Sequence, residues 1–389
     1  MIDNLSTKDV TIIVPTKNRP DFLFRLLNYY VKAQFKGVIF IGDASNDNFL
    51  QENLQIISDF QAKITVEHFV KNMGVNGTIE VLSQKIETTY CLFCADDDFV
   101  VPNGIARALT FLKENSDYSA VHGKGSQISL DTDECFGSII SLNSYPQTFV
   151  DEETGAERLK SYLMQSYTLL FAVHRTETWK KMFHGFSGFD WSNSQEMTID
   201  EILSSGVSVI LGKIKEIDGL YLIRQSHPNQ KLDSDCDVEG LSPSELVLHK
   251  DWSIALQDMS NRFIEEIMIV DQIEYDEAKA LVHEILLCHI EKSFRVNQKN
   301  IEQMDASLKL LLIIGKEVIS NNMPSYLKHL LKKILFLRAR GQSLLSIKTL
   351  NDELSIYYND FKLIQLACSE KFVPKKIDAQ FLNDLPPNF

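Results

Sequence analysis

The sequence predicts an α/β fold, with a doubly wound, mainly parallel sheet in the first part and an all-helical C-terminal part. Two observations predict this arrangement. Short apolar segments alternate with amphipathic helical segments over the N-terminal third of the chain, as they do in proteins with parallel sheets. After a polar, acidic stretch at 233–237, only helical periodicity continues. We therefore expect one domain over residues 1–238 and a helical domain over residues 239–389.

Four short runs near the N-terminus predict strands, and the first of them is apolar, rich in β-branched residues and typical of a buried strand. These runs cover residues 10–15, 37–42, 63–69 and 90–95. Apolar residues at helical spacing predict the connecting helices, which cover residues 20–36, 50–60 and 77–85. Farther along, we expect short strands at 120–122 and 127–130, a helix over 155–165, and mixed strand and loop structure over 206–222. The helices expected after the boundary cover residues 244–270, 276–295, 301–319, 325–340 and 343–368.

The composition is ordinary for a soluble globular protein and disfavours a nucleic-acid partner. The chain has 389 residues, of which 44% are hydrophobic and 24% are charged. Its formal net charge of −14 disfavours binding that depends on neutralising phosphates. We find no secretory leader and no apolar run of about 18 residues, the length that a bilayer-spanning helix needs. The sequence therefore predicts a cytoplasmic protein.

Polar loops follow the first, second and fourth predicted strands, at 16–19, 43–47 and 96–98. Ligands of doubly wound sheets bind beyond the carboxyl ends of the strands, so we expect these loops to form one site. The last loop is Asp96-Asp97-Asp98, and adjacent carboxylates repel one another unless a cation neutralises them. Mg²⁺ and Mn²⁺ prefer such oxygen ligands. The alternative is an acidic turn before the helix that begins near Pro102.

These segments resemble family 2 glycosyltransferases, which have the GT-A fold. Residues 12–19 are similar to the family's first strand and turn, and residues 39–47 are similar to its second strand. Gly42 and Ala44 depart from the family pattern, which usually has Asp and Gly there. The Asp triplet at 96–98 resembles the family's DXD motif. The resemblance covers roughly residues 8–230 and implies transfer of a sugar from a nucleotide-sugar donor.

The resemblance also implies a donor site at these loops, with a UDP-sugar as the default expectation. Asp43 would accept hydrogen bonds from the base, unless it caps the turn before residue 48. Arg19 would approach the phosphates, although a solvated surface charge explains it equally well. The expected donor contacts are Pro15, Thr16, Arg19, Asp43, Asn72, Asp96 and Asp97. The expected ligands of a Mn²⁺ or Mg²⁺ cofactor are Asp98, Asp96 and His227.

The general base of an inverting transfer is expected within residues 194–203. In the family it belongs to a Glu-Asp pair ahead of a helix, and here the pair is inverted as Asp200-Glu201. Glu201 aligns with the base, Asp200 is adjacent, and Glu196 stays open as a third candidate. The alternative is that these acids only favour a helix N-terminus.

The glycine-rich segment that precedes this acidic pair is similar to the family's approach to the acceptor pocket. An aromatic ring in such a segment can stack on the face of a sugar, although core packing would explain it equally well. The expected acceptor contacts are Gly188, Asp190 and Trp191.

The helical segment at 325–340 has five basic residues and no acidic residue. Such a helix would suit peripheral contact with anionic lipid at the inner face of the membrane. We favour the alternative that it packs in a helical bundle, which would also suit homo-oligomerisation.

The preferred hypothesis is a metal-dependent, inverting glycosyltransferase with a glycan or lipid-linked acceptor, acting in cell-surface polysaccharide synthesis. One alternative is a sugar-phosphate nucleotidyltransferase, but residues 14–19 lack the glycines that such enzymes carry after the first strand. The other is a non-catalytic scaffold with a GT-A-like fold.

Overall fold

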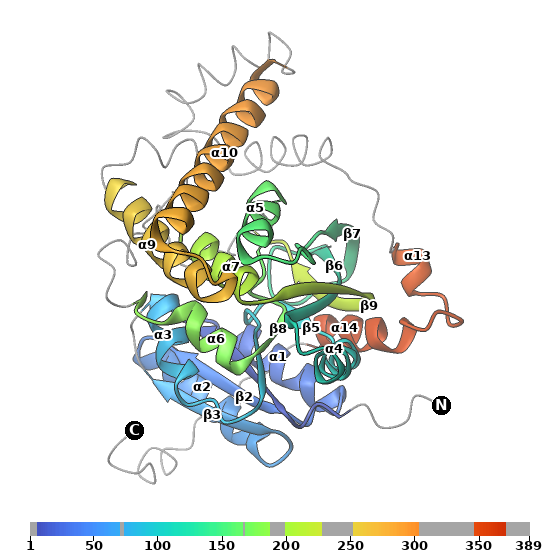
Figure 1. The fold of residues 1–389 in the computed structure, drawn as a ribbon. Helices are drawn as coiled ribbons and strands as arrows, with labels where there is room; N and C mark the ends of the chain where they lie inside the picture. The colour runs from blue at the N-terminus through green and yellow to red at the C-terminus, as the bar shows by residue number, and fades with distance from the viewer. Residues whose placement is uncertain are drawn as a thin grey trace, which may run out of the picture.

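The computed structural model describes residues 6–70, 74–165, 168–186, 199–227, 252–302 and 346–370. Within these ranges, the centre of the molecule is a nine-stranded mixed sheet with helices on both faces (Figure 1). The strands follow the order β3-β2-β1-β4-β8-β6-β9-β5, and β7 pairs with β6. The predicted α/β class is confirmed.

The strands are β1 (Val10–Thr16), β2 (Val38–Asp43), β3 (Thr65–Val70), β4 (Tyr90–Phe93), β5 (Phe99–Val100), β6 (Tyr118–Leu130), β7 (Ile139–Tyr145), β8 (Val173–Arg175) and β9 (Lys213–Gln225). The helices before residue 238 are α1 (Pro20–Lys32), α2 (Asp47–Gln61), α3 (Gly74–Ser83), α4 (Pro102–Glu114), α5 (Gly155–Gln165), α6 (Thr176–Phe183) and α7 (Ile199–Leu211). The described helices after it are α9 (Trp252–Asp271), α10 (Tyr275–Glu302), α13 (Ile347–Leu350) and α14 (Tyr358–Ser369).

The N-terminal half of the sheet is parallel, as the alternation of strands and helices predicts. Strand β1 lies between β2 and β4, and β3 pairs with the other edge of β2. The first five residues of β1 are all buried, which explains why they form a continuous β-branched run instead of an alternating one. The parallel register places Thr16 opposite Asp43. The loops after β1 and β2 therefore leave the sheet at the same edge.

Four expected elements differ from the structure. Residues 206–222 do not form mixed strand and loop structure, because α7 continues to residue 211 and β9 follows as one long strand. Helix α7 packs against α5, α6 and α9, so its apolar residues surround the helix and conceal the helical period. The strands expected at 120–122 and 127–130 are parts of the single strand β6. The helix expected over 343–368 is divided into α13 and α14.

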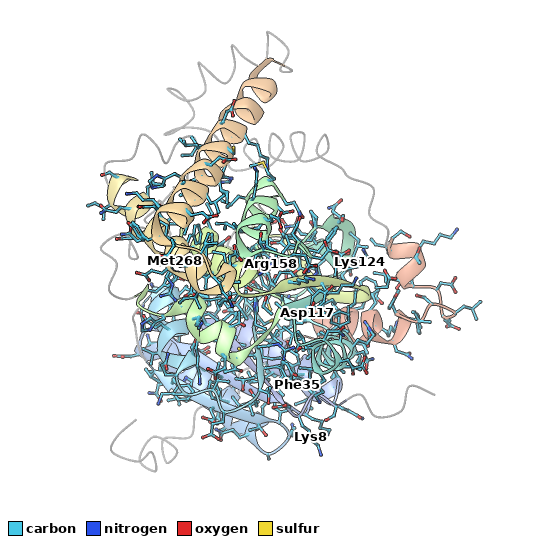
Figure 2. All side chains as sticks on the ribbon, in the orientation of Figure 1. Lys8, Phe35, Asp117, Lys124, Arg158 and Met268 are labelled. Carbon is cyan, nitrogen blue, oxygen red and sulfur yellow. The ribbon has the colours of Figure 1, made fainter. Side chains whose placement is uncertain are left out.

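The described C-terminal helices share the hydrophobic core of the sheet. Phe361 and Ile364 of α14 belong to the cluster formed by β1, α1 and α4. Phe263 and Ile267 of α9 belong to the cluster on the opposite face, with α5, α6 and α7. Met268 of α9, labelled in Figure 2, is partly buried against the same cluster. The boundary expected at residue 238 lies outside the described residues and stays a prediction.

The helix expected at 325–340 also lies outside the described residues. Of the helix expected at 301–319, only the first two residues are described. Among the described helices, none combines the length and apolar character required to cross a bilayer.

We expect Gly206→Val to weaken the contact between α7 and α9. A Cβ atom at Gly206 would lie 2.5 Å from Cζ of Phe263, which is too close for an undisturbed contact. Overpacking of this kind should lower the free energy of unfolding by about 1–3 kcal/mol, measured by urea denaturation. Phe263→Leu in the same chain should recover part of the loss. An unchanged unfolding midpoint in Gly206→Val would contradict the close packing of these helices.

Candidate active site

The Asp triplet lies at the sheet edge where β1, β2 and β4 end. Main-chain pairing continues past β4, since the Cys94 nitrogen donates to the Ile13 oxygen at 3.0 Å. The chain then turns, and the nitrogen of Asp98 donates to the oxygen of Ala95 at 3.1 Å. This turn brings the triplet beside the loop that follows β1, as the sequence predicts.

Asp96 and Asp97 are bridged by one guanidinium group. Nη1 of Arg19 lies 3.0 Å from Oδ1 of Asp96 and 3.0 Å from Oδ2 of Asp97. The Thr16 hydroxyl donates to Oδ2 of Asp96 at 2.8 Å. Nε2 of His227 lies 3.0 Å from Oδ2 of Asp97, and its ring stacks on Phe22. Four of the expected donor and metal residues therefore converge around Arg19.

Asp98 faces the opposite direction, toward β9. Its carboxylate is fully buried and accepts hydrogen bonds from Nε of Arg224 at 2.9 Å and from the main-chain nitrogen of Gln225 at 3.1 Å. Arg224 also donates to the Tyr145 hydroxyl at 2.9 Å and lies over the rings of Tyr145 and Phe171. The structure does not bring Asp98 and His227 together, because His227 lies against Asp97.

The three carboxyl groups differ in their electrostatic surroundings. Burial raises the pKa of Asp96 to about 6 and that of Asp98 to about 7, and the charge of Asp97 adds to both shifts. Burial would also raise the pKa of Asp97, but the hydrogen bond from His227 and the charge of Arg19 outweigh it and lower the pKa. Asp97 is therefore the member of the triplet that most strongly favours its ionised form.

The residues around Asp97 fit part of the ligand set of a divalent cation. Carboxylate oxygen suits Mn²⁺ and Mg²⁺. Nδ1 of His227 is buried without a hydrogen-bond partner among the described residues, so this nitrogen could serve as a further ligand. Within those residues, no three His, Cys, Asp or Glu side chains converge closely enough to hold an ion on their own. Asp97 and His227, with Asp96 beside them, would therefore provide only part of a coordination shell.

Asp43 lies where the sequence predicts, but its carboxylate points into the protein. Its oxygens accept hydrogen bonds from the nitrogen of Ser45 at 2.9 Å and from the Asn53 amide at 2.9 Å, and Nε2 of His68 lies 3.1 Å away. Burial opposes ionisation, but these three contacts together lower the pKa of Asp43. The side chain is fully buried and joins β2 to α2 and β3.

The loops after β1 and β2 are joined by hydrogen bonds. The nitrogen of Ala44 donates to the oxygen of Thr16 at 3.0 Å, and the nitrogen of Asn18 donates to the Ser45 hydroxyl at 2.7 Å. Pro15 is half-buried at the end of β1. These contacts hold the two loops together at the edge where the triplet lies.

Close packing of α3 against β2 explains why residue 42 is a glycine. A Cβ atom at this position would lie 2.2 Å from Cγ2 of Thr78, since α3 lies directly against β2. The Asp that the family usually carries here would not fit beside α3, which explains this departure from the family pattern.

Asp200 and Glu201 occupy the first turn of α7. Asp200 is half-buried and accepts a hydrogen bond from the Asn76 amide in the first turn of α3, while burial raises its pKa. Glu201 is exposed. Burial raises the pKa of Tyr145, Arg224 opposes this shift, and the charges of Asp98 and Glu201 increase it. The charge of Glu201 therefore acts on Tyr145, the residue that contacts Arg224.

The remaining expected residues lie outside the described ranges: Asn72, Gly188, Asp190, Trp191 and Glu196. No role was expected for Arg25, Asn76 or Arg224, which contact Asp97, Asp200 and Asp98, or for Tyr145, which contacts Arg224. Arg25 could have been found from the sequence, because it interrupts the apolar face of α1.

Residues 11–154 match the model of the glycosyl transferase family 2, which confirms the resemblance. The matched range contains β1 to β4 and the Asp triplet, and together with the α/β sheet it confirms the predicted GT-A fold. Asp200, Glu201, Arg224 and His227 lie beyond this range. A comparison with curated proteins found no match.

Three solved structures show distant similarity to this chain. S. aureus TarS is 15% identical with a TM-score of 0.47, and the match covers 92% of this chain but only 55% of that chain. S. aureus TarS 1–349 in complex with UDP-GlcNAc is 17% identical with a TM-score of 0.48, covering 77% of both chains. The mannosyltransferase PcManGT from Pyrobaculum calidifontis, in complex with GDP-Man and Mn²⁺, is 11% identical with a TM-score of 0.39, covering 81% of both chains.

We expect Arg224→Gln to destabilise the protein, because it leaves the fully buried Asp98 without its cation. Breaking a buried pair from one side should lower the free energy of unfolding by about 3 kcal/mol, measured by chemical denaturation. Lys160→Gln, which breaks the exposed pair with Glu284, is the matched control and should leave stability unchanged. Equal stability of Arg224→Gln and wild type would show that Asp98 does not depend on Arg224.

Proposed function

We propose that this chain, which carries a family 2 glycosyltransferase domain, transfers a glycosyl group from a nucleotide-sugar donor to a glycan or lipid-linked acceptor with inversion. The observation that carries the proposal is the convergence of Thr16, Arg19, Asp97 and His227 at the carboxyl edge of β1, β2 and β4. This is the edge at which open α/β sheets bind their ligands. We take UDP as the nucleotide to test first.

The donor diphosphate would lie beside Arg19, whose guanidinium group is a cation suited to phosphate. Mn²⁺ or Mg²⁺ held by Asp97 and His227, with Asp96 beside them, would stabilise negative charge on the departing nucleoside diphosphate. Asp98 would act indirectly, by holding Arg224 between the rings of Tyr145 and Phe171.

We assign the general base to Glu201. Its side chain is exposed, so an acceptor hydroxyl can reach it, whereas Asp200 is half-buried. As the hydroxyl oxygen attacks the anomeric carbon, its proton passes to Glu201. The bond between that carbon and the phosphate oxygen breaks, and the nucleoside diphosphate leaves with the bonding electrons.

The helical segment after residue 238 belongs to the same proposal. Contact of residues 325–340 with the inner face of a membrane would bring the site close to a lipid-linked acceptor. Self-association through the helical part is the other role that we propose for it, and sedimentation with and without anionic vesicles distinguishes the two.

We expect UDP with Mn²⁺ to raise the melting temperature of the wild type and not that of Asp97→Asn. Ligand at 100 times its dissociation constant stabilises a protein by about 2.7 kcal/mol, which a thermal shift assay detects readily. Asp117→Asn is the control, since Asp117 is exposed and pairs only with Lys213 among the described residues. Equal shifts in Asp97→Asn and the control would contradict the donor site.

Replacing the acids of α7 should separate donor binding from turnover. Glu201→Gln should bind UDP normally but lose at least about 100-fold in turnover, because the base is gone. Asp200→Asn should lose less turnover than Glu201→Gln. The measurement is UDP release from a panel of UDP-sugars with an acceptor, alongside binding by calorimetry. Full turnover in Glu201→Gln would exclude it as the base.

A further inference from the structure

Arg25 of α1 is a buried cation that the proposed chemistry does not use. Its side chain has no exposed surface. Nη1 donates to the main-chain oxygen of Cys135 at 2.6 Å and to Oε1 of Gln225, and Nη2 donates to the main-chain oxygen of Asp97 at 2.8 Å. Among the described residues, no carboxylate forms an ion pair with it.

Such a residue is costly to bury. A guanidinium group that loses water needs either an ion pair or a favourable electrostatic environment. Nε of Arg25 has no hydrogen-bond partner among the described residues, so its donors are not even fully satisfied. A Leu or Met would fill the same space on the apolar face of α1 at lower cost. The charge therefore requires an explanation beyond packing.

The Asp triplet explains the charge. Asp96, Asp97 and Asp98 carry three formal negative charges, and Arg19 and Arg224 compensate two of them through direct ion pairs. Arg25 lies directly behind the main chain of Asp97 and provides the third positive charge. Its position is fixed, because the guanidinium carbon lies 4.9 Å from the ring centroids of Phe22 and Phe99.

Arg25 also connects the two segments that carry Asp97 and His227. One segment is the turn of Asp97, held through its main-chain oxygen. The other is the end of β9, held through Gln225, whose main-chain nitrogen bonds to Asp98. His227 follows two residues later and contacts both Asp97 and Phe22.

We propose that Arg25 is a positioning residue of the donor site. It fixes the main chain that carries Asp97 and the main chain that carries His227, and so keeps the carboxylate and the imidazole facing each other. Only the expected effect of Arg25 on donor binding rests on the proposed function. Changes behind the direct ligands of a metal typically cost 10–100-fold in affinity. Lys cannot replace Arg25, because a single ammonium group cannot reproduce its fixed fork of donors.

The test compares Arg25→Lys with Arg158→Lys. Arg158 is also buried and bonds to main-chain oxygens, those of Glu152, Glu153, Val209 and Ile210, but it caps α7 on another part of the molecule (Figure 2). We expect both variants to lose stability. Only Arg25→Lys should weaken the calorimetric affinity for UDP with Mn²⁺, by about 10-fold or more. Equal affinities in the two variants would show that Arg25 only supports the fold.

A second readout does not depend on nucleotide binding. The imidazole NMR signal of His227 in the free protein, assigned with His227→Gln, should shift in Arg25→Lys and stay unchanged in Arg158→Lys. If this shift occurs but UDP does not bind the wild type, the positioning role is supported and the proposed function fails. An unchanged signal would overturn the proposal. If Arg25→Lys does not fold, Gln225→Ala removes one of the same links and should give the same two changes.

Discussion

The site depends on one electrostatic constraint, which is that three consecutive carboxyl groups are buried at the edge of the sheet. Such a cluster is destabilising unless buried cations or bound protons neutralise its charge. The cations are arginine side chains from distant parts of the chain, namely Arg19 and Arg25 of the first loop and helix, and Arg224 of β9. The ends of β1, β4 and β9 are therefore held together by charge as well as by the sheet.

This constraint separates the roles within the triplet. Asp98 faces inward and holds Arg224, whereas Asp97 meets His227 and remains the carboxylate that favours ionisation. A cation bound at Asp97 would join a region whose formal charges are already balanced by arginine. The negative charge that a divalent ion would need can come from the donor diphosphate, which explains why we expect metal and nucleotide to bind together.

Local patterns predicted much of the fold. The first four strands and the helices between them follow from periodicity, and the shared edge of their loops follows from parallel pairing. The part of helix α7 that follows residue 202 could not be identified, because residues 203–210 are all buried and leave no exposed polar face. The partners of Asp98 were also missed, since Arg224 lies 126 residues away and no local pattern connects them. Only Arg25 left a local signal, as a charge on an apolar helix face.

The most direct measurement is a crystal structure of the protein with UDP and Mn²⁺. We expect an ion bound by Asp97 and His227, with the diphosphate bound to that ion beside Arg19 and with Asp98 still paired with Arg224. A nucleotide bound away from the carboxyl edge of β1 and β4, with Arg19 still bridging Asp96 and Asp97 and no ion near them, would contradict the donor site.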